Sequence, residues 1–136
     1  MASPKRNAYL AIKYYQDNQN RQLIEELAFA LNQADWSSHV VVRDLEDWGR
    51  ISFTPRELME RSLNLLSTCE LCVAECTEKA VGVGLEAGYA YAKGIPLILL
   101  ARQGTKISTT LHGIASEIIF YDMVDELPDQ LKAIDL

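Results

Sequence analysis

The chain has 136 residues, of which 49% are hydrophobic and 24% are charged. This length predicts one domain over residues 1–136, and the balance is that of a folded globular protein, which excludes disordered and fibrous classes. The longest apolar run, residues 95–101, is far too short to cross a membrane, and the N-terminal stretch MASPKRNAYL contains no apolar signal segment. We therefore expect a cytoplasmic protein with no membrane partner.

The net charge of −6 limits the possible partners. The 19 acidic residues outnumber the 13 basic ones, and the longest basic cluster is Lys5-Arg6. A nucleic acid polymer would be repelled, so we expect none as a partner. A small anionic ligand is still compatible with this charge, because the N-terminus of a single helix can bind a phosphate group.

The three cysteines, Cys69, Cys72 and Cys76, lie in one short segment and raise the question of a metal site. This segment is predicted to be a buried strand, in which side chains alternate, so Cys72 and Cys76 share one face and Cys69 takes the other. They cannot converge on one ion, and no fourth ligand has suitable spacing. We interpret them as small buried hydrophobic residues in a reducing compartment and expect no metal.

Local signals predict alternating strands and helices in the first half of the chain. Apolar residues recur at three- and four-residue spacing between Leu23 and Leu31, which is typical of one face of a helix. Thr54, Pro55 and Glu57 match a helix start with a capping box and a proline at the first helical position. In chain order, we expect a strand at residues 7–15, a helix from the polar stretch 17–20 to about 34, a strand at 39–43, a loop at 44–53 and a helix at 54–68.

The second half continues the alternation. Gly94 stands where a left-handed residue usually ends a helix, and the run that follows it is apolar throughout, as in a strand covered on both faces. In chain order, we expect a strand at residues 70–76, a turn at 77–80, a helix at 81–93, a strand at 95–101, a short helix at 108–114, a strand at 117–121 and a helix at 124–134.

This order of elements predicts the fold class. Strands that alternate with helices form a parallel sheet with right-handed crossovers and helices on both faces. We therefore expect a three-layer α/β/α domain with a five-stranded parallel sheet, Rossmann- or flavodoxin-like. Ligands of such folds bind outside the carboxyl ends of the strands.

One glycine-rich segment, VGVGLEAGY at residues 81–89, follows the third predicted strand at that edge. Its glycine spacing differs from the dinucleotide fingerprint, and no acidic residue follows at the ribose position, so we expect no dinucleotide cofactor. Without side chains at Gly82 and Gly84, a ligand can approach the backbone and the first helical amides. Glu86 lies in the opening turns, where the helix dipole favours a carboxylate that could attack an anomeric carbon. Alternatively, Glu86 is only a solvated residue.

The segment CELCVAECTEKAVGVGLEAGYAYAKGIPLILL resembles the core of the nucleoside 2-deoxyribosyltransferase family, which includes the 2′-deoxynucleoside 5′-monophosphate N-hydrolases. The resemblance extends from Tyr9 to about Asp122 and is most specific in VGVGLEAGYA. It implies a small α/β enzyme, homodimeric or larger, in which Glu86 attacks C1′ and displaces the base. By the same resemblance, Tyr9 matches a tyrosine that hydrogen-bonds near that glutamate; alternatively it packs in the core.

The resemblance also bears on the substrate. Ser108 falls where the family presents a residue to the active site of a neighbouring subunit, and there the N-hydrolases tend to have a serine that contacts the 5′-phosphate. This favours a phosphorylated substrate, whereas the stretch 17–20 resembles the transferases more than the glycine- and arginine-bearing loop of the hydrolases. Alternatively, Ser108 only caps the short helix.

The chain departs from the family at two positions. Ser62 stands where the family has an aspartate that assists sugar binding and base protonation, and Ala80 stands where it has an acidic or hydroxyl residue. A departing base must be protonated or otherwise stabilised, and general acid catalysis typically contributes about 10²–10⁴-fold. The candidates to supply a proton are Glu75, Asp44, Glu46 and Glu60.

We expect an enzyme that cleaves the N-glycosidic bond of a (deoxy)nucleoside or its 5′-monophosphate through a covalent intermediate on Glu86, with transfer to another base or to water. The alternative is a nucleotide-binding or sensing module with little or no turnover. We expect no cofactor, and a homo-oligomer in which Ser108 is contributed across the interface. The expected catalytic residues are Glu86 and Tyr9, and the expected substrate-binding residues are Gly82, Gly84, Ser62, Glu75 and Ser108.

Overall fold

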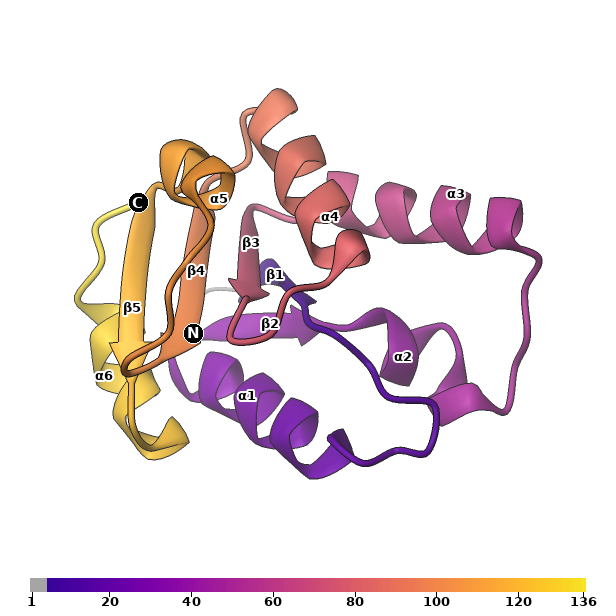
Figure 1. The fold of residues 1–136 in the computed structure, drawn as a ribbon, viewed down its shortest axis with the longest axis horizontal. Coiled ribbons are helices and arrows are strands. Elements are labelled where there is room, and N and C mark those ends of the chain that lie inside the picture. Colours follow the sequence, from indigo (N-terminus) through magenta and orange to yellow (C-terminus); the bar gives the residue numbers. More distant parts are fainter. Residues whose placement is uncertain (1–4) are drawn as a thin grey trace.

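The computed structural model describes residues 5–136. A five-stranded parallel sheet with the order β2-β1-β3-β4-β5 lies between two layers of helices (Figure 1). The strands are β1 (Arg6–Ala11), β2 (Trp36–His39), β3 (Leu71–Glu75), β4 (Leu97–Arg102) and β5 (Glu117–Tyr121). The predicted three-layer fold is confirmed. The strand order places the topological switch point between β1 and β3.

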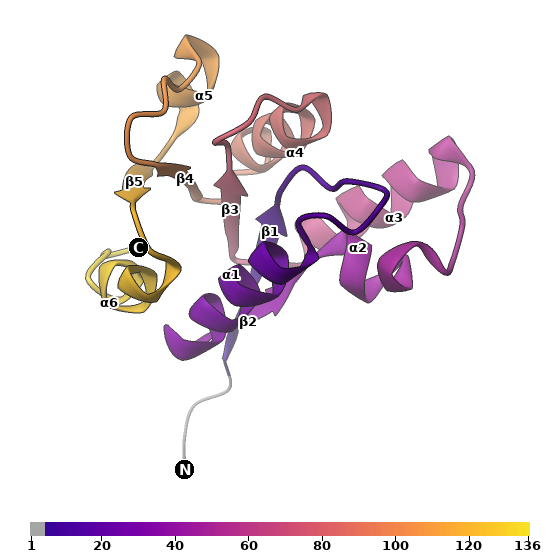
Figure 2. The same ribbon diagram turned by 60° about the horizontal axis from the view of Figure 1, so that its bottom comes forward.

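The helices divide between the two faces of this sheet. Figure 2 shows α1 and α6 on one side and α3, α4 and α5 on the other. The helices are α1 (Arg21–Gln33), α2 (Val41–Asp44), the 3₁₀ helix η1 (Asp47–Gly49), α3 (Pro55–Ser67), α4 (Val81–Ala92), α5 (Thr109–Ile114), the 3₁₀ helix η2 (Val124–Glu126) and α6 (Leu127–Lys132). Within residues 5–136, no helix is both long enough and apolar enough to span a membrane.

Alternation along the two central strands decides which layer each side chain meets. On β1, Tyr9 and Ala11 join the apolar cluster under α3, α4 and α5, whereas Leu10 joins the cluster under α1 and α6. On β3, Cys72 lies on the same side as Tyr9, and the two residues pair directly in the parallel register. The switch point therefore holds Tyr9 and Cys72 side by side beneath α4.

Two local predictions are confirmed in atomic detail. The capping box of α3 is formed, because the Glu57 N–H donates to Thr54 Oγ1 at 3.2 Å and the Thr54 N–H donates to Glu57 Oε1 at 3.1 Å. Gly94 follows the end of α4 with a φ of +73°, a left-handed conformation that side chains other than glycine rarely adopt.

The predicted strand at residues 39–43 is wrong. The strand β2 ends at His39, and Val41 and Val42 form the short helix α2, where the Val40 N–H donates to the Asp44 carboxylate at 2.9 Å. Val40 and Val42 are nevertheless buried in the core. A run of valines can be buried in either conformation, and here the hydrogen bond from the Val40 N–H to Asp44 is compatible with the helix only.

The prediction that Cys69 faces away from the other two cysteines is also wrong. The strand β3 begins only at Leu71, so strict alternation does not extend back to Cys69. All three thiols are buried in the apolar cluster beneath α3 and α4. Within residues 5–136, no group of three or more His, Cys, Asp or Glu side chains could hold a metal ion.

Candidate functional site

Glu86 points back toward the first turn of α4. A Cβ atom added to Gly82 would lie 3.8 Å from Glu86 Oε1, so the carboxylate occupies the flank that this glycine leaves open. A Cβ atom added to Gly84 would meet nothing within 4 Å, so its absence opens space on the outer side of α4. The two glycines thus have different local effects: Gly82 borders the carboxylate, and Gly84 borders a cavity.

Partial burial beside the apolar layer under α4 raises the pKa of Glu86. Burial raises the pKa of Glu86 to about 7, and the Tyr9 hydroxyl opposes part of this rise. Burial is also the main cause that raises the pKa of Tyr9 and of Cys72, and the charge of Glu86 raises both further. Among residues 5–136, no second carboxylate lies close enough to shift the pKa of Glu86. Glu86 therefore ionises near neutral pH, in a site without a neighbouring acid.

The Tyr9 hydroxyl is unusual among buried groups. Its side chain is fully buried, and its oxygen has no partner at the distances and angles of a hydrogen bond within the described chain, although it lies close enough to Glu86 for the two pKa values to be linked. Buried polar atoms are nearly always hydrogen-bonded, and leaving one unpaired is destabilising. An unpaired hydroxyl beside an acid with a raised pKa is typical of a functional site.

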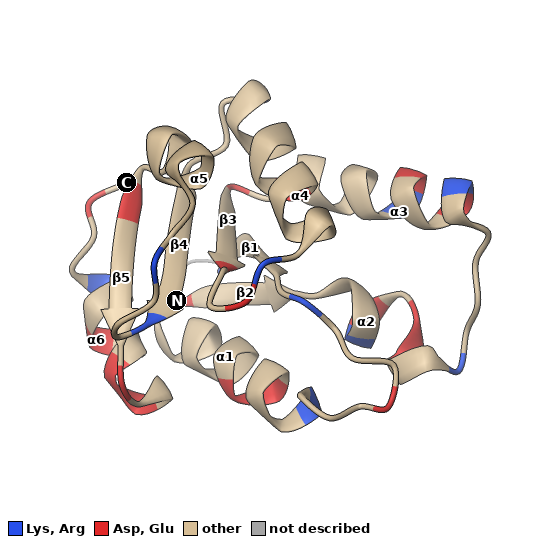
Figure 3. Ribbon diagram, viewed as in Figure 1, with Lys and Arg blue, Asp and Glu red and all other residues tan. Residues whose placement is uncertain are grey.

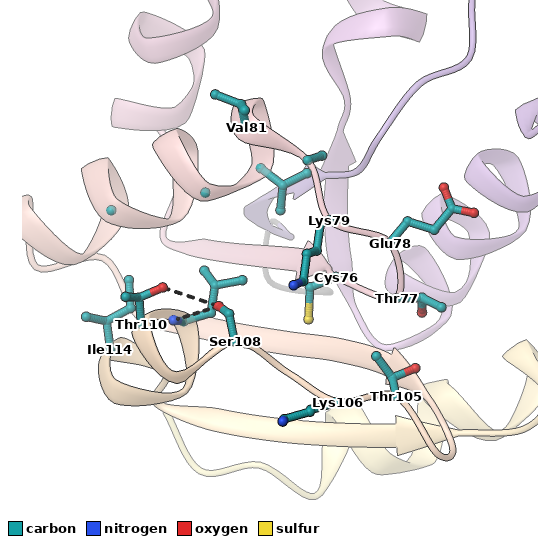
Figure 4. Close-up of a pocket in the computed structure, with 15 residues that line it drawn as sticks. Cys76, Thr77, Glu78, Lys79, Val81, Thr105, Lys106, Ser108, Thr110 and Ile114 are labelled. Atoms are coloured by element: carbon teal, nitrogen blue, oxygen red, sulfur yellow. Dashed lines mark hydrogen bonds between the residues drawn. The ribbon is translucent and has the colours of Figure 1, made fainter.

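A cavity of about 780 Å³ lies on the other flank of α4, between α4 and α5. Neither Glu86 nor Tyr9 lines it; its walls come from the loop before α4, from Gly84 and Gly88, and from the segment that leads into α5. Figure 4 shows Lys79 and Lys106 on opposite sides of this cavity. Sequence reasoning missed both lysines, because they are isolated in the chain and only the fold brings them to one cavity.

The N-terminus of α4 opens beside this cavity without a side-chain cap. Ala80 is the N-cap residue and offers no side-chain acceptor to the first helical amides. Such amides need another partner, and an anion is well suited to them because of the helix dipole. The cavity lining thus carries two cations, Lys79 and Lys106, and one carboxylate, Glu78, beside the uncapped helix end, in a protein with a net charge of −6.

Ser108 caps α5, which is the second of the two roles that the sequence suggested for it. Its hydroxyl accepts from the Leu111 N–H at 3.3 Å and lies 3.2 Å from Thr110 Oγ1 (Figure 4). It lines the cavity between α4 and α5, whereas Glu86 lies on the opposite flank of α4. One chain therefore does not bring Ser108 and Glu86 into the same cavity.

The remaining expected site residues are divided between the two faces of the sheet. Ser62 is buried on the face of α3 that also carries Leu66, and α3 packs against α4, so Ser62 lies in the same layer as Glu86. Glu75, at the end of β3, points to the other face, where its carboxylate accepts from the Tyr121 hydroxyl and from Thr77. The structure therefore does not bring Glu75 to Glu86.

The other candidate acids are also separated from Glu86. Asp44 is partly buried, which raises its pKa, but hydrogen bonds from Arg43 and Val40 outweigh this and lower it. Burial raises the pKa of Glu46, and Glu60 is exposed on α3. None of these carboxylates contributes to the pKa of Glu86. Within residues 5–136, Glu86 is thus a half-buried carboxylate with no second carboxylic acid beside it to protonate a leaving base.

Known proteins resemble this chain in sequence. No protein-family model matches the chain. It is 31% identical over 135 residues to "Putative 2′-deoxynucleoside 5′-phosphate N-hydrolase 1" of Thermofilum pendens, an alignment that covers 92% of each chain. It is 34% identical over 82 residues to the 5-hydroxymethyl-dUMP N-hydrolase of Rattus norvegicus, covering 58% of this chain and 50% of that one.

Solved structures share the fold at lower identity. A CMP N-glycosidase of Clostridium botulinum matches with a TM-score of 0.69 and 21% identity, over 95% of this chain and 100% of that chain. A 2-deoxyribosyltransferase of Bacillus psychrosaccharolyticus matches with a TM-score of 0.72 and 14% identity, over 95% and 92%. With a relative at 31% identity across nearly its whole length, the chain belongs to the nucleoside 2-deoxyribosyltransferase family, which includes the 2′-deoxynucleoside 5′-phosphate N-hydrolases.

Proposed function

We propose that the protein cleaves the N-glycosidic bond of a (deoxy)nucleoside 5′-monophosphate, with Glu86 as the nucleophile. The observation that carries this proposal is the half-buried Glu86 carboxylate, with a pKa near 7, beside the open flank at Gly82 and the buried hydroxyl of Tyr9. The names of the relatives, two N-hydrolases and an N-glycosidase that act on nucleotides, support the same reaction class.

The reaction has two balanced steps. A Glu86 carboxylate oxygen forms a bond to C1′ while the C1′–N bond breaks, and the departing base takes the electron pair and then a proton from water. Water, or a second base, then attacks C1′ and releases the carboxylate, and the proton that the attacking group loses neutralises the hydroxide left by the first step. The Tyr9 hydroxyl, which has no other partner among residues 5–136, would donate to the carboxylate and orient the attacking oxygen.

Two lysines and a helix N-terminus at the cavity support a phosphorylated substrate. Lys79, Lys106 and the uncapped N-terminus of α4 lie at this cavity, on the flank of the helix opposite the one that holds Glu86. A 5′-phosphate bound at the first turn of α4 would leave the sugar near Gly82 and hence near the Glu86 carboxylate. We therefore infer that the phosphate anchors the nucleotide and that free nucleosides are poorer substrates.

The outer face of α4 supports assembly with a second copy of the chain. Glu86 is the only charged residue of α4, α5 has none, and most charges lie on other elements (Figure 3). Val81 is 84% exposed and Leu85 is 56% exposed on this apolar face. A second copy would cover these side chains and, in a symmetric dimer, bring its Ser108 to the flank of α4 that one chain leaves incomplete.

A second candidate function is a nucleotide sensor without turnover. It is favoured by the lack of an acid at Ser62 and Ala80 and by the absence of a second carboxylate beside Glu86 in the described chain. Such a sensor would be stabilised thermally by nucleotides, would release no base, and would bind nearly as well when Glu86 is replaced.

Replacing the nucleophile separates the two candidate functions. Glu86→Gln is expected to lower base release from nucleoside monophosphates by about 10³-fold or more, because the covalent route is lost and enzymes typically supply accelerations of about 10⁶-fold or more. The control Glu25→Gln changes a glutamate on the exposed face of α1 and leaves the rate unchanged. Chromatography of free base measures both. A wild-type protein that binds nucleotides but releases no base would establish the sensor instead.

The pH dependence of the reaction tests the state of the carboxylate. Because Glu86 must be ionised to attack, kcat/KM is expected to fall as the pH drops through about 7, the raised pKa of this group. Tyr9→Phe removes the hydroxyl that lowers this pKa, so the acid limb moves to higher pH. The control Tyr91→Phe, at an exposed position of α4, leaves it in place. An acid limb near 4.5, the ordinary value for glutamate, would contradict the assignment.

Subunit complementation tests whether Ser108 acts across an interface. Glu86→Gln and Ser108→Ala chains are each expected to be weakly active alone. In a mixed dimer, the Glu86 of the Ser108→Ala chain faces the intact Ser108 of the other chain, so one complete site forms and base release recovers on mixing. If Ser108 serves its own chain, the mixture shows only the sum of the separate activities.

A further inference from the structure

The last residue of β3 carries a buried carboxylate that the proposed reaction does not use. Glu75 is 4% exposed and is the only acidic residue in the buried interior of residues 5–136. It lies on the face of the sheet covered by α1 and α6, opposite the face that holds Glu86. Burying a carboxylate is unfavourable unless hydrogen-bond donors compensate it, so its partners indicate why it is there.

The donors to Glu75 come from two elements at the ligand-binding edge of the sheet. The Thr77 N–H donates to Glu75 Oε1 at 2.6 Å, and Thr77 Oγ1 donates to Glu75 Oε2 at 2.9 Å. The Tyr121 hydroxyl, at the end of β5, also donates to Oε2. The Arg102 N–H, at the end of β4, donates to Thr77 Oγ1 at 3.1 Å. One carboxylate thus links the carboxyl ends of β3, β4 and β5.

The residue that this network holds most directly is Thr77, which begins the loop to α4. Residues 76–80 form one wall of the cavity between α4 and α5, and Ala80 is the N-cap residue of α4. The contacts of this loop from Lys13 and Tyr15 to Glu78 are exposed and contribute little rigidity. At the start of the loop, the Cys76 thiol donates to the Leu100 carbonyl at 3.5 Å. The Glu75 network is therefore the buried side-chain restraint on Thr77, the residue that leads toward α4.

We propose that Glu75 is a positioning residue, whose buried carboxylate holds the β3–α4 loop so that the N-terminus of α4 and the phosphate-binding wall of the cavity stay in place. Glu75 touches no substrate in this account; it acts through Thr77. The proposal rests on the proposed function for the location of the substrate, but the loop restraint itself can be measured without any substrate.

The test compares three variants by amide hydrogen exchange and by steady-state kinetics. Glu75→Gln replaces one acceptor oxygen with a donor, so exchange of the Thr77 and Arg102 amides should accelerate about 10-fold, while amides of α1 and α6 keep their rates. The KM for a nucleoside monophosphate should rise about 10-fold or more with kcat nearly unchanged, since small displacements of positioning groups have effects of this size. Tyr121→Phe removes one donor to Glu75 at a residue that does not line the cavity between α4 and α5, and it should shift both quantities in the same direction by less.

The matched control is Glu70→Gln, directly before the opposite end of β3. The Glu70 carboxylate accepts from the Asn7 N–H, away from the loop, so its replacement should change neither the local exchange nor the KM. Faster exchange spread evenly over the sheet, or a Glu75→Gln protein with the exchange rates and KM of Glu70→Gln, would overturn the proposal. If Glu75→Gln does not fold, Tyr121→Phe decides, and wild-type behaviour overturns it. If the wild type releases no base, the proposed function fails, while the exchange rates still decide the role of Glu75.

Discussion

Partial burial of the Glu86 carboxylate, on the side of α4 that packs toward Tyr9, is the constraint on which the rest of the site depends. An ionised carboxylate is disfavoured in an apolar layer, and the raised pKa of about 7 expresses that penalty. The nearest polar group, the Tyr9 hydroxyl, has no other partner in the described chain, and Gly82 leaves the carboxylate flank open. Each of these features weakens the fold locally, and together they prepare one oxygen for chemistry.

Because side chains alternate along a strand, β3 places Glu75 on the face of the sheet opposite the one that holds Glu86. Cys72 and Ala74 of β3 face the layer of Glu86, whereas Glu75 faces the layer of α1 and α6. The same strand therefore contributes an apolar floor under the nucleophile and, one residue later, a buried anchor for the loop that starts α4. The two acids have opposite environments: Glu75 is surrounded by donors, and Glu86 has a single hydroxyl nearby.

Local signals in the sequence were sufficient to predict the structure wherever a single residue or turn determines the backbone conformation. The capping box at Thr54 and the left-handed Gly94 act within a single turn, so both were predictable. The valines near residue 41 were misassigned, because their burial is compatible with strand and helix alike, and the hydrogen bond from the Val40 N–H to Asp44 was not foreseen. Cys69 was misplaced since the start of β3 is set by pairing with other strands rather than by its own residues.

The site was predictable only in part, for a related reason. The glycine pattern around Glu86 lies on one helix and pointed directly to the carboxylate. Counting alternate residues along β3 from Cys72 would have shown that Glu75 points away from that site. The convergence of Lys79 and Lys106 on one cavity depends on the β4–α5 connection, and no spacing in the sequence reveals it. The flank on which Ser108 lies likewise follows only from how α5 docks beside α4.

The central claim is that Glu86 forms a covalent ester with the sugar, and mass spectrometry tests it most directly. The enzyme is mixed with a nucleoside monophosphate, quenched in acid during turnover, digested and analysed by peptide. The account predicts a peptide that contains Glu86 with the added mass of the sugar phosphate, absent in Glu86→Gln and retained in Glu25→Gln. Rapid base release with no adduct on Glu86, or with an adduct on another residue, would contradict it.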